Sequence, residues 1–177
     1  FYINSSKMYL TGGSYVDLLT FSYDFLFPET IKAIAVGSGN LPEFPESGIC
    51  TNGSTLPIPI LLTHGTSDPA MPANGGCVAN VGGNCNRGKV ISQTATLNYW
   101  LQRNGLQNIN PTISTFNVNT TDAGNVEKRI YNSANPLVYY ILNNAGHQAP
   151  SKTVFSNSSP AQGVQNRDIE FAEEVWN

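Results

Sequence analysis

The sequence predicts an α/β fold: a mostly parallel sheet with helices on both faces. Short, continuous apolar runs alternate with segments of helical spacing, and this alternation is typical of parallel sheets covered by helices. Small and polar residues follow three of the apolar runs directly, at the strand ends where open α/β sheets bind ligands. With 177 residues, 40% of them hydrophobic, the chain has room for one domain with a core.

The first half predicts two strands and a helix. Residues 7–10 form a short strand that enters the turn Thr11-Gly12-Gly13-Ser14-Tyr15. A helix follows over residues 17–27 and stops at Pro28. The side chains that share its helical face are Leu18, Phe21, Ser22, Phe25 and Leu26. Residues 31–36 are an apolar strand that ends in Gly37-Ser38-Gly39, and we expect residues 40–57 to form a surface loop.

The second half continues the alternation. We expect strands at 58–63 and 137–142, and a hairpin of 112–121 with 126–131 around residues 122–125. A helix over 92–104 ends at Gly105 and turns Leu97, Trp100 and Leu101 inward. A last helix over 166–176 has Ile169, Ala172, Val175 and Trp176 on one face. Both tryptophans are therefore expected in the core, which disfavours a sugar-binding module built on them.

The low charge of the chain and the length of its apolar runs exclude two classes of partner. Only 12% of residues are charged and the formal net charge is −3, so no basic patch is available to follow a phosphate backbone. No apolar run approaches the length that spans a bilayer. We therefore expect neither nucleic acid nor a membrane as a partner.

Asn, Ser, Thr, Gln and Gly must instead cover the surface, a composition common in secreted proteins. Four N-x-S/T sequons, as candidate glycosylation sites, start at Asn4, Asn52, Asn119 and Asn157. About three would arise by chance in a chain this rich in Asn, Ser and Thr. The first residue is Phe1, and we expect that a segment has been removed upstream of it. We expect a secreted, extracellular protein.

The chain has three cysteines, so at least one lacks a partner within it. Cys77 and Cys85 flank a Gly/Asn-rich loop, residues 78–84, and are candidates for a disulfide in an oxidising compartment. Cys50 would then be free or bonded to a group outside this chain.

The turn at Ser14 is a candidate nucleophile elbow. A strand that runs into small residues around one serine, and then into a helix, lifts the hydroxyl above the edge of the sheet. The usual G-x-S-x-G motif has a glycine where this chain has Val16, so an ordinary Gly/Ser turn is the competing interpretation.

A catalytic serine needs a base, and the chain has two histidines. His147 follows Gly146 in a loop that lets its imidazole reach a neighbouring strand end. His64 lies just beyond a strand, and we interpret it as a structural histidine. Asp68 is the candidate acid that orients His147, although an Asp before Pro69 is also an ordinary turn residue. The order Ser14, Asp68, His147 is the nucleophile–acid–base order of α/β-hydrolases.

These residues lie in segments spread over most of the chain: Tyr9-Leu10-Thr11-Gly12 with Ser14, Phe27-Pro28 through Ala33-Ile34-Ala35, Ser38-Gly39, Pro59-Ile60-Leu61, His64-Gly65-Thr66 with Asp68 and Pro72, and Gly146-His147 with Pro150. In them the chain resembles the carboxyl-terminal part of the polyhydroxybutyrate-depolymerase and feruloyl-esterase group of α/β-hydrolases, which are secreted serine esterases. The resemblance implies Ser14 as nucleophile, Asp68 as acid, His147 as base and the Tyr15 N–H in the oxyanion hole. It implies an acyl-enzyme released by water, and we expect no metal and no cofactor.

The chain departs from that family at three positions. Val16 and Asp17 stand where the family has glycines, and Ala149 stands where it has a tryptophan of the substrate wall. We expect Val16 to crowd the contact between helix and strand, and Asp17 to serve the start of the helix.

The resemblance also implies that amino-terminal strands are absent, together with the loop that donates the second oxyanion N–H. Residues 1–177 are then the carboxyl-terminal portion of a single α/β-hydrolase domain. The strand that begins at Lys7 would be an open edge, completed by a missing amino-terminal segment or by a second chain.

Two functions follow. The first is a secreted serine carboxylic-ester hydrolase that acts on polymer-linked esters, such as feruloylated or acetylated polysaccharide or a polyhydroxyalkanoate. The second is a catalytically impaired extracellular structural or binding protein that retains the scaffold.

Overall fold

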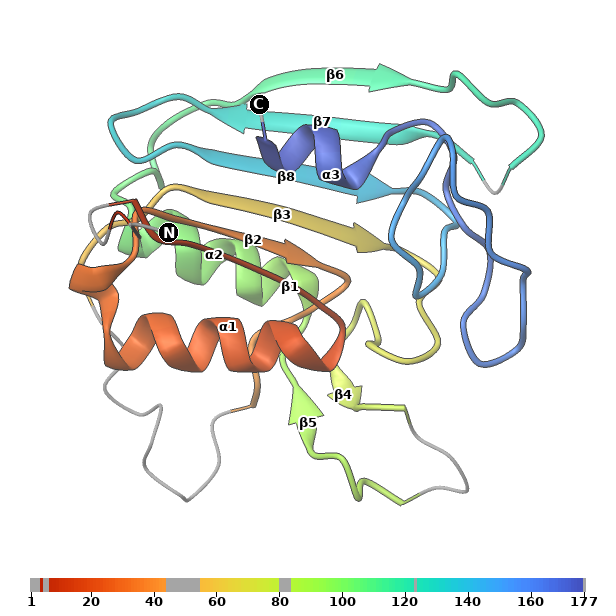
Figure 1. Ribbon diagram of the computed structural model, residues 1–177, viewed down its shortest axis with the longest axis horizontal. Coiled ribbons are helices and arrows are strands. Elements are labelled where there is room, and N and C mark those ends of the chain that lie inside the picture. Colours follow the sequence, from red (N-terminus) through yellow and green to blue (C-terminus); the bar gives the residue numbers. More distant parts are fainter. Residues whose placement is uncertain (1–3, 5–6, 44–54, 80–83, 123, 177) are drawn as a thin grey trace.

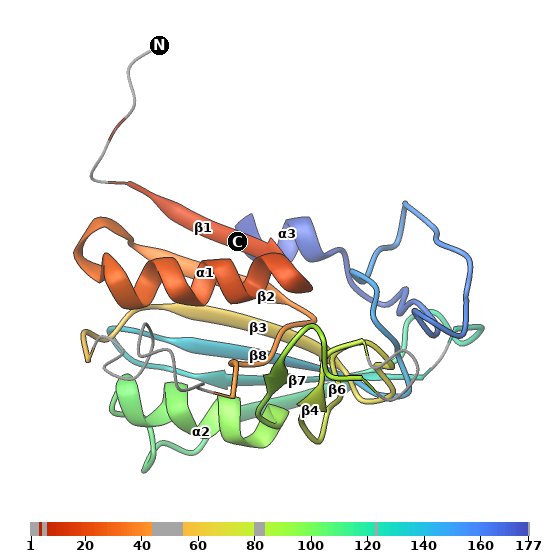
Figure 2. The same cartoon turned by 90° about the horizontal axis from the view of Figure 1, so that it is seen from below.

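The computed structural model describes residues 4, 7–43, 55–79, 84–122 and 124–176. Its centre is a six-stranded sheet in the order β1-β2-β3-β8-β7-β6, with helices on both faces (Figures 1 and 2). The sheet strands are β1 (Tyr9–Gly13), β2 (Ala33–Gly37), β3 (Ile60–Gly65), β6 (Thr112–Phe116), β7 (Val126–Tyr131) and β8 (Leu137–Leu142). The helices are α1 (Tyr15–Leu26), the short 3-10 turn η1 (Pro28–Thr30), α2 (Gln93–Arg103) and α3 (Phe171–Trp176).

Four strands of this sheet run parallel. β1 pairs with β2, β2 with β3 and β3 with β8 in parallel, whereas β7 and β6 are antiparallel to their neighbours. The predicted α/β class, the mostly parallel sheet and the hairpin of β6 and β7 are confirmed. In this register Gly13 pairs with Gly37, and Gly65 with Leu142. The carboxyl ends of β1, β2, β3 and β8 therefore meet at one edge of the sheet.

The larger core lies on the face covered by α1 and α2. Phe21 of α1 packs against Trp100 of α2 with ring centroids 5.9 Å apart. The other side chains of this core come mainly from the strands, and include Ile34, Val36, Ile60, Leu62, Leu137 and Tyr139. α2 begins at Ser92, whose side chain accepts the Ala95 N–H, and it ends before Gly105, which has a φ of 68°.

A buried ion pair joins the two helices of this face. The guanidinium of Arg103 in α2 donates from both terminal nitrogens to the carboxylate of Asp24 in α1, with Nη2 3.0 Å from Oδ1. The same guanidinium lies 4.6 Å from the ring centroid of Trp100. Burial raises the pKa of Asp24, and the bonds from Arg103 oppose that shift.

The opposite face holds a smaller core. It contains Val126, Tyr140, Leu142, Ala145 and Ile169, with α3 beside it. Lys128 and Tyr140 of the sheet both contact Glu174 of α3. Helices therefore cover both faces, as the sequence predicted (Figure 2).

The carboxyl-terminal helix was predicted too long. α3 begins only at Phe171, because the preceding residues form a network of side-chain hydrogen bonds instead. Asp168 accepts the backbone N–H groups of Val118 and Asn119 and the side-chain amide of Asn166. The prediction that Trp176 lies in the core was wrong, since this side chain is 90% exposed.

Two predictions for α1 were also wrong. Leu26 was expected on its inner face but is half exposed, whereas Asp17 and Asp24 are fully buried there. Val16 was expected to crowd the helix–strand contact, and its side chain is 52% exposed instead.

β1 forms one edge of the sheet, as predicted for the strand at the start of the chain. Tyr9 of β1 is 64% exposed at this edge, and Tyr15 and Leu19 of α1 are exposed as well.

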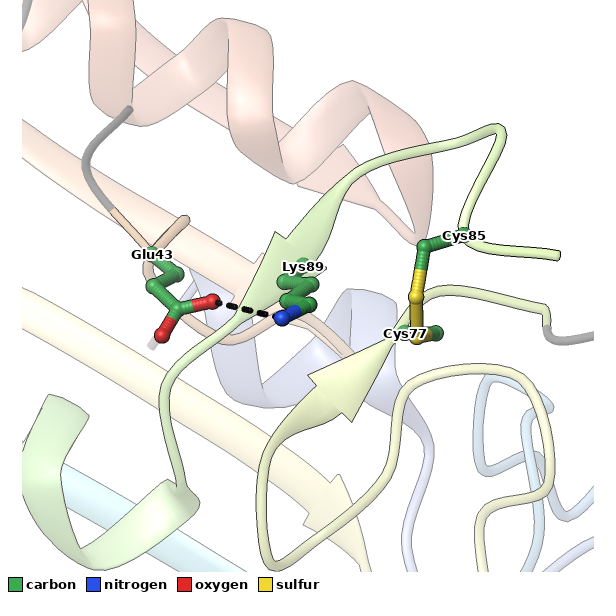
Figure 3. The surroundings of a disulfide bond; sticks show 4 residues. All are labelled: Glu43, Cys77, Cys85 and Lys89. Carbon is green, nitrogen blue, oxygen red and sulfur yellow. Dashed lines mark ion pairs between the residues drawn. A yellow bond between two sulfur atoms is a disulfide. The ribbon is translucent and has the colours of Figure 1, made fainter. Parts of the chain in front are cut away.

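A second, two-stranded sheet pairs β4 (Gly76–Cys77) with β5 (Lys89–Val90). The predicted disulfide between Cys77 and Cys85 is present next to it, with Cα atoms 5.0 Å apart (Figure 3). On the other side of the hairpin Lys89 lies 3.9 Å from the carboxylate of Glu43.

The third cysteine, the four sequons and the predicted surface loop lie partly outside the described residues. Cys50, Asn52 and most of the predicted loop 40–57 lie outside the described residues. Asn4 and Asn157 are exposed, and Asn119 is partly buried. Across the described ranges, no helix combines the length and apolar character needed to cross a bilayer.

Candidate active site

Ser14 occupies a strained turn between β1 and α1. Its φ of 62° and ψ of −125° lie in a region that residues with a side chain rarely adopt. The Ser14 N–H donates to the Gly37 carbonyl at 2.9 Å, and the Ser14 carbonyl accepts the Asp17 N–H at 3.0 Å. A Cβ atom on Gly12 would lie 2.8 Å from Thr20 Oγ1, so the approach of helix to strand requires glycine there. This is the geometry of a nucleophile elbow.

The structure brings Ser14, His147 and Asp68 together from three strand ends. Ser14 Oγ lies 2.5 Å from His147 Nε2, and His147 Nδ1 lies 2.7 Å from Asp68 Oδ2. A serine at the start of a helix commonly accepts a backbone N–H with its side chain, but Ser14 makes no such capping bond in α1. Its hydroxyl is directed to the imidazole instead.

Asp68 makes the contacts that both interpretations of this residue require. Its Oδ1 accepts the backbone N–H groups of Ala70 and Met71, at 2.8 and 2.7 Å, as a turn residue does. Its Oδ2 faces His147. Because an ionised carboxylate only accepts, Nδ1 of His147 is the donor in that bond. In the neutral imidazole, Nε2 is then the nitrogen that accepts the hydroxyl proton of Ser14.

The loop that carries His147 is tethered rather than free. The Gly146 N–H donates to Val164 and the His147 N–H to Gln162, at 2.7 and 2.5 Å. A side chain at position 146 would collide with the Gln162 carbonyl, so glycine is required by close packing. As expected, this loop lets the imidazole of His147 reach a neighbouring strand end, and the two backbone hydrogen bonds hold it there. No pattern in the sequence pointed to the segment around Gln162.

His64 is a structural histidine, as expected, although it lies within β3 rather than beyond it. It is 2% exposed, and Nε2 donates to the Met71 carbonyl at 3.1 Å. Burial lowers the pKa of His64 to about 4, against the opposing charge of Asp68. Because the ring is neutral, its 3.8 Å approach to Asp68 is not an ion pair.

Asp17 was expected to serve the start of α1, and the backbone N–H of Ser14 at that start is among its partners, but the sequence did not predict that its side chain would be buried. It lies in the first turn of α1, but its carboxyl group is fully buried beneath the elbow, and Oδ1 accepts the Gly37 N–H at 3.3 Å. Within the described part of the chain Oδ2 has no hydrogen-bond partner. Burial raises the pKa of Asp17 to about 8, and backbone hydrogen bonds from Gly37 and Ser14 oppose the shift.

Tyr15 is the first residue of α1 and follows the candidate nucleophile. The first N–H groups of a helix have no carbonyl partner within it, and the helix dipole makes this end electropositive. The Tyr15 N–H is therefore available to an oxyanion carried by the carbon atom that is bonded to Ser14 Oγ.

An open cavity of about 420 Å³ lies beside His147, between its loop and the start of α3. Its walls combine amides, hydroxyls and the carboxylate of Glu170 with apolar groups, among them Gln148, Ser156, Gln165, Val154 and Phe171. A second groove of about 380 Å³ on the outer face of α1 is lined by Tyr15, Val16, Leu18, Leu19 and Ser22.

Among the residues that the structure describes, no group of three or more His, Cys, Asp or Glu side chains is arranged to hold a metal ion. In the comparisons with known proteins, no protein-family model and no curated protein matches the chain. The chemical arrangement of the site therefore carries the functional argument.

Proposed function

We propose that this chain belongs to a serine carboxylic-ester hydrolase of the α/β-hydrolase type, in which Ser14 is the nucleophile, His147 the general base and Asp68 the acid that orients it. The observation that carries the proposal is the continuous relay from Asp68 Oδ2 through His147 to Ser14 Oγ, with contacts of 2.7 and 2.5 Å. A structural serine has no need of an imidazole held in the accepting tautomer, or of a strained backbone that aims its hydroxyl at that imidazole.

The reaction would proceed in two halves. Ser14 Oγ attacks the ester carbonyl and its proton passes to His147 Nε2, while the Tyr15 N–H stabilises the oxyanion. The tetrahedral intermediate then expels the alcohol, which takes the proton from His147, and leaves an acyl group on Ser14. Water attacks that ester with His147 as base, which releases the carboxylic acid and restores the serine.

The proposed substrate is a polymer-linked ester: a feruloylated or acetylated polysaccharide, or a polyhydroxyalkanoate. The open cavity beside His147 supports this choice, because a side group can enter it while the rest of a polymer stays outside. Its amide, hydroxyl and carboxylate groups can bind the hydroxyls of such a side group, and its apolar walls can pack against the rest of that group.

We further propose that the protein is extracellular. The disulfide between Cys77 and Cys85 supports an oxidising compartment. The candidate glycosylation sites Asn4, Asn52, Asn119 and Asn157 would be modified in such a compartment in a eukaryotic host.

The open edge of β1 supports a partner for the sheet. Unpaired backbone groups and the exposed Tyr9 form an edge that natural proteins cover. An amino-terminal segment of the same polypeptide or a second chain would complete the sheet there and contribute the second oxyanion donor.

Hydrolysis of a set of esters tests the proposal. Aryl acetate and butyrate, methyl ferulate, acetylated xylan and a hydroxybutyrate oligomer are assayed with the wild-type protein and with Ser14→Ala, whose fold is checked by circular dichroism. We expect turnover of at least one ester by the wild type and none above background by the variant. Absence of turnover with every ester would favour the scaffold protein, and equal turnover by Ser14→Ala would exclude Ser14 as nucleophile.

A further inference from the structure

The buried carboxyl group of Asp17 has no part in the relay, yet it touches each backbone segment that shapes the elbow. Its Oδ1 lies 3.3 Å from the Gly37 nitrogen at the end of β2. A Cβ atom on Gly39 would lie 2.5 Å from Asp17 Oδ2, and one on Gly12 would lie 2.9 Å from Oδ1. The two glycines thus leave a space that the carboxyl group fills.

The same backbone holds the nucleophile. The Gly37 carbonyl accepts the Ser14 N–H, so one peptide segment of β2 bonds Ser14 through its oxygen and Asp17 through its nitrogen. The Asp17 N–H in turn donates to the Ser14 carbonyl. A strained φ of 62° persists only where the surroundings over-determine it, and these three bonds do so.

We propose that Asp17 is a positioning residue for Ser14: its carboxyl group fastens the start of α1 to the end of β2 and so holds the strained turn that aims Ser14 Oγ at His147. The expected effect of Asp17 on the rate at which Ser14 reacts rests on the proposed function. Its expected effect on the turn at Ser14 rests on the fold alone.

The carboxyl group acts in its neutral form. Burial raises the pKa of Asp17 to about 8, and the groups in contact with it within the described ranges are uncharged. Asp24, further along α1, is paired with Arg103, and the imidazole of His147 contacts Ser14 rather than Asp17. The other titratable side chains of β1 and α1 are the tyrosines Tyr9, Tyr15 and Tyr23. Above about pH 8 an uncompensated carboxylate would form beneath the elbow and loosen it.

The test measures the rate at which a fluorophosphonate probe modifies Ser14 between pH 6 and 10, in the wild type and in Asp17→Asn, Asp17→Ala and Asp24→Asn. The wild-type rate is expected to fall above about pH 8. Asp17→Asn mimics the neutral acid, so it should keep the wild-type rate at pH 7 and lose the alkaline fall. Asp17→Ala should react about 10- to 100-fold more slowly at pH 7. Asp24→Asn makes the same chemical change on the same helix, and should keep the wild-type pH profile.

Amide hydrogen exchange at Ser14 and Gly37 gives a readout that does not need activity. At a common pH, exchange of both amides should accelerate in Asp17→Ala, and at pH 9 it should be faster in the wild type than in Asp17→Asn. If the wild type is never modified but exchange shows this dependence, the proposed function fails and the positioning role stands. If Ser14 is modified while the rates, the pH profile and exchange are unchanged in both Asp17 variants, the positioning role is overturned.

Discussion

Helix α1 presents two buried carboxyl groups to the same side, about two turns apart, and the protein holds them in opposite ways. Asp24 is paired with the guanidinium of Arg103, which also covers Trp100, and this pair joins two helices. Asp17 lies beneath the strained turn at Ser14, where its carboxyl group accepts the Gly37 N–H and fills the space beside Gly12 and Gly39. Burial raises the pKa of both, but an ion pair opposes the shift only at Asp24. Asp24 therefore holds two helices together, whereas Asp17 supports the turn that carries Ser14.

The largest expected effect is at a third buried carboxyl group, that of Asp68. It both holds its own turn together and contacts His147 of the site. Asp68→Asn retains an oxygen for the Ala70 and Met71 N–H groups, so the turn should survive. Its amide cannot hold His147 in the tautomer that accepts the proton of Ser14, so ester hydrolysis should fall about 10⁴-fold. Steady-state kinetics measures the loss, and an unchanged melting temperature serves as the control. A loss below tenfold would mean that His147 does not depend on Asp68.

Removal of the Asp24–Arg103 pair should lower the free energy of unfolding and leave ester hydrolysis unchanged. Arg103→Ala leaves Asp24 buried without its partner, and should lower the free energy of unfolding by about 3–5 kcal/mol. Urea denaturation measures this, with Lys89→Ala as a control. The pair of Lys89 and Glu43 is exposed and should contribute less than about 1 kcal/mol. Equal losses of unfolding free energy in Arg103→Ala and Lys89→Ala would mean that the buried ion pair contributes no more to stability than the exposed one.

The pH dependence of stability sharpens the contrast at Asp17. An acid whose pKa is about 8 when folded and 3.8 when free binds its proton more tightly in the folded state. Its contribution is therefore fully present below pH 4 and is lost as the pH rises to about 8. Between pH 5 and 8 the wild type should lose on the order of 1 kcal/mol per pH unit relative to Asp17→Asn.

Urea denaturation of the two proteins across this range measures the difference. Parallel curves would show that Asp17 ionises near its ordinary pKa. The predicted pH dependence would then be wrong, whereas the contacts of Asp17 with the elbow would be unaffected.

The smallest expected effect contrasts the two tryptophans. Trp100 is fully buried between α1 and α2, whereas Trp176 at the end of α3 is 90% exposed. Trp176→Ala should change the free energy of unfolding by less than about 0.5 kcal/mol, and Trp100→Ala should lower it by about 3–5 kcal/mol. A large loss for Trp176→Ala would indicate that this side chain is covered in solution.

The sequence predicted the features that depend on local pattern. The strand over residues 137–142 has the bounds of β8, and α2 lies within the predicted 92–104, because apolar periodicity and the Ser92 and Gly105 signals act within a few residues. The three residues of the relay were identifiable because parallel strands bring their carboxyl ends to one edge. Each of the three follows an apolar strand, so the fold class alone places them near one another.

The sequence failed where long-range contacts override local pattern. Residues 166–168 have helical spacing, but the side chain of Asp168 accepts the backbone N–H groups of Val118 and Asn119, which lie about 50 positions away along the chain. Asp17 resembles an ordinary acid in the first turn of a helix, and only the approach of Gly37 and Gly39 turns it inward. The tether of His147 to Gln162 likewise joins two segments that carry no shared motif.

The central claim is that Ser14, His147 and Asp68 act as one unit, and peptide mapping after reaction with a fluorophosphonate tests it most directly. We expect one adduct per molecule, on the peptide that contains Ser14, in the wild type at pH 7, and little or none in folded His147→Ala. An unmodified Ser14 in folded wild-type protein, or an adduct that persists undiminished in His147→Ala, would contradict the account.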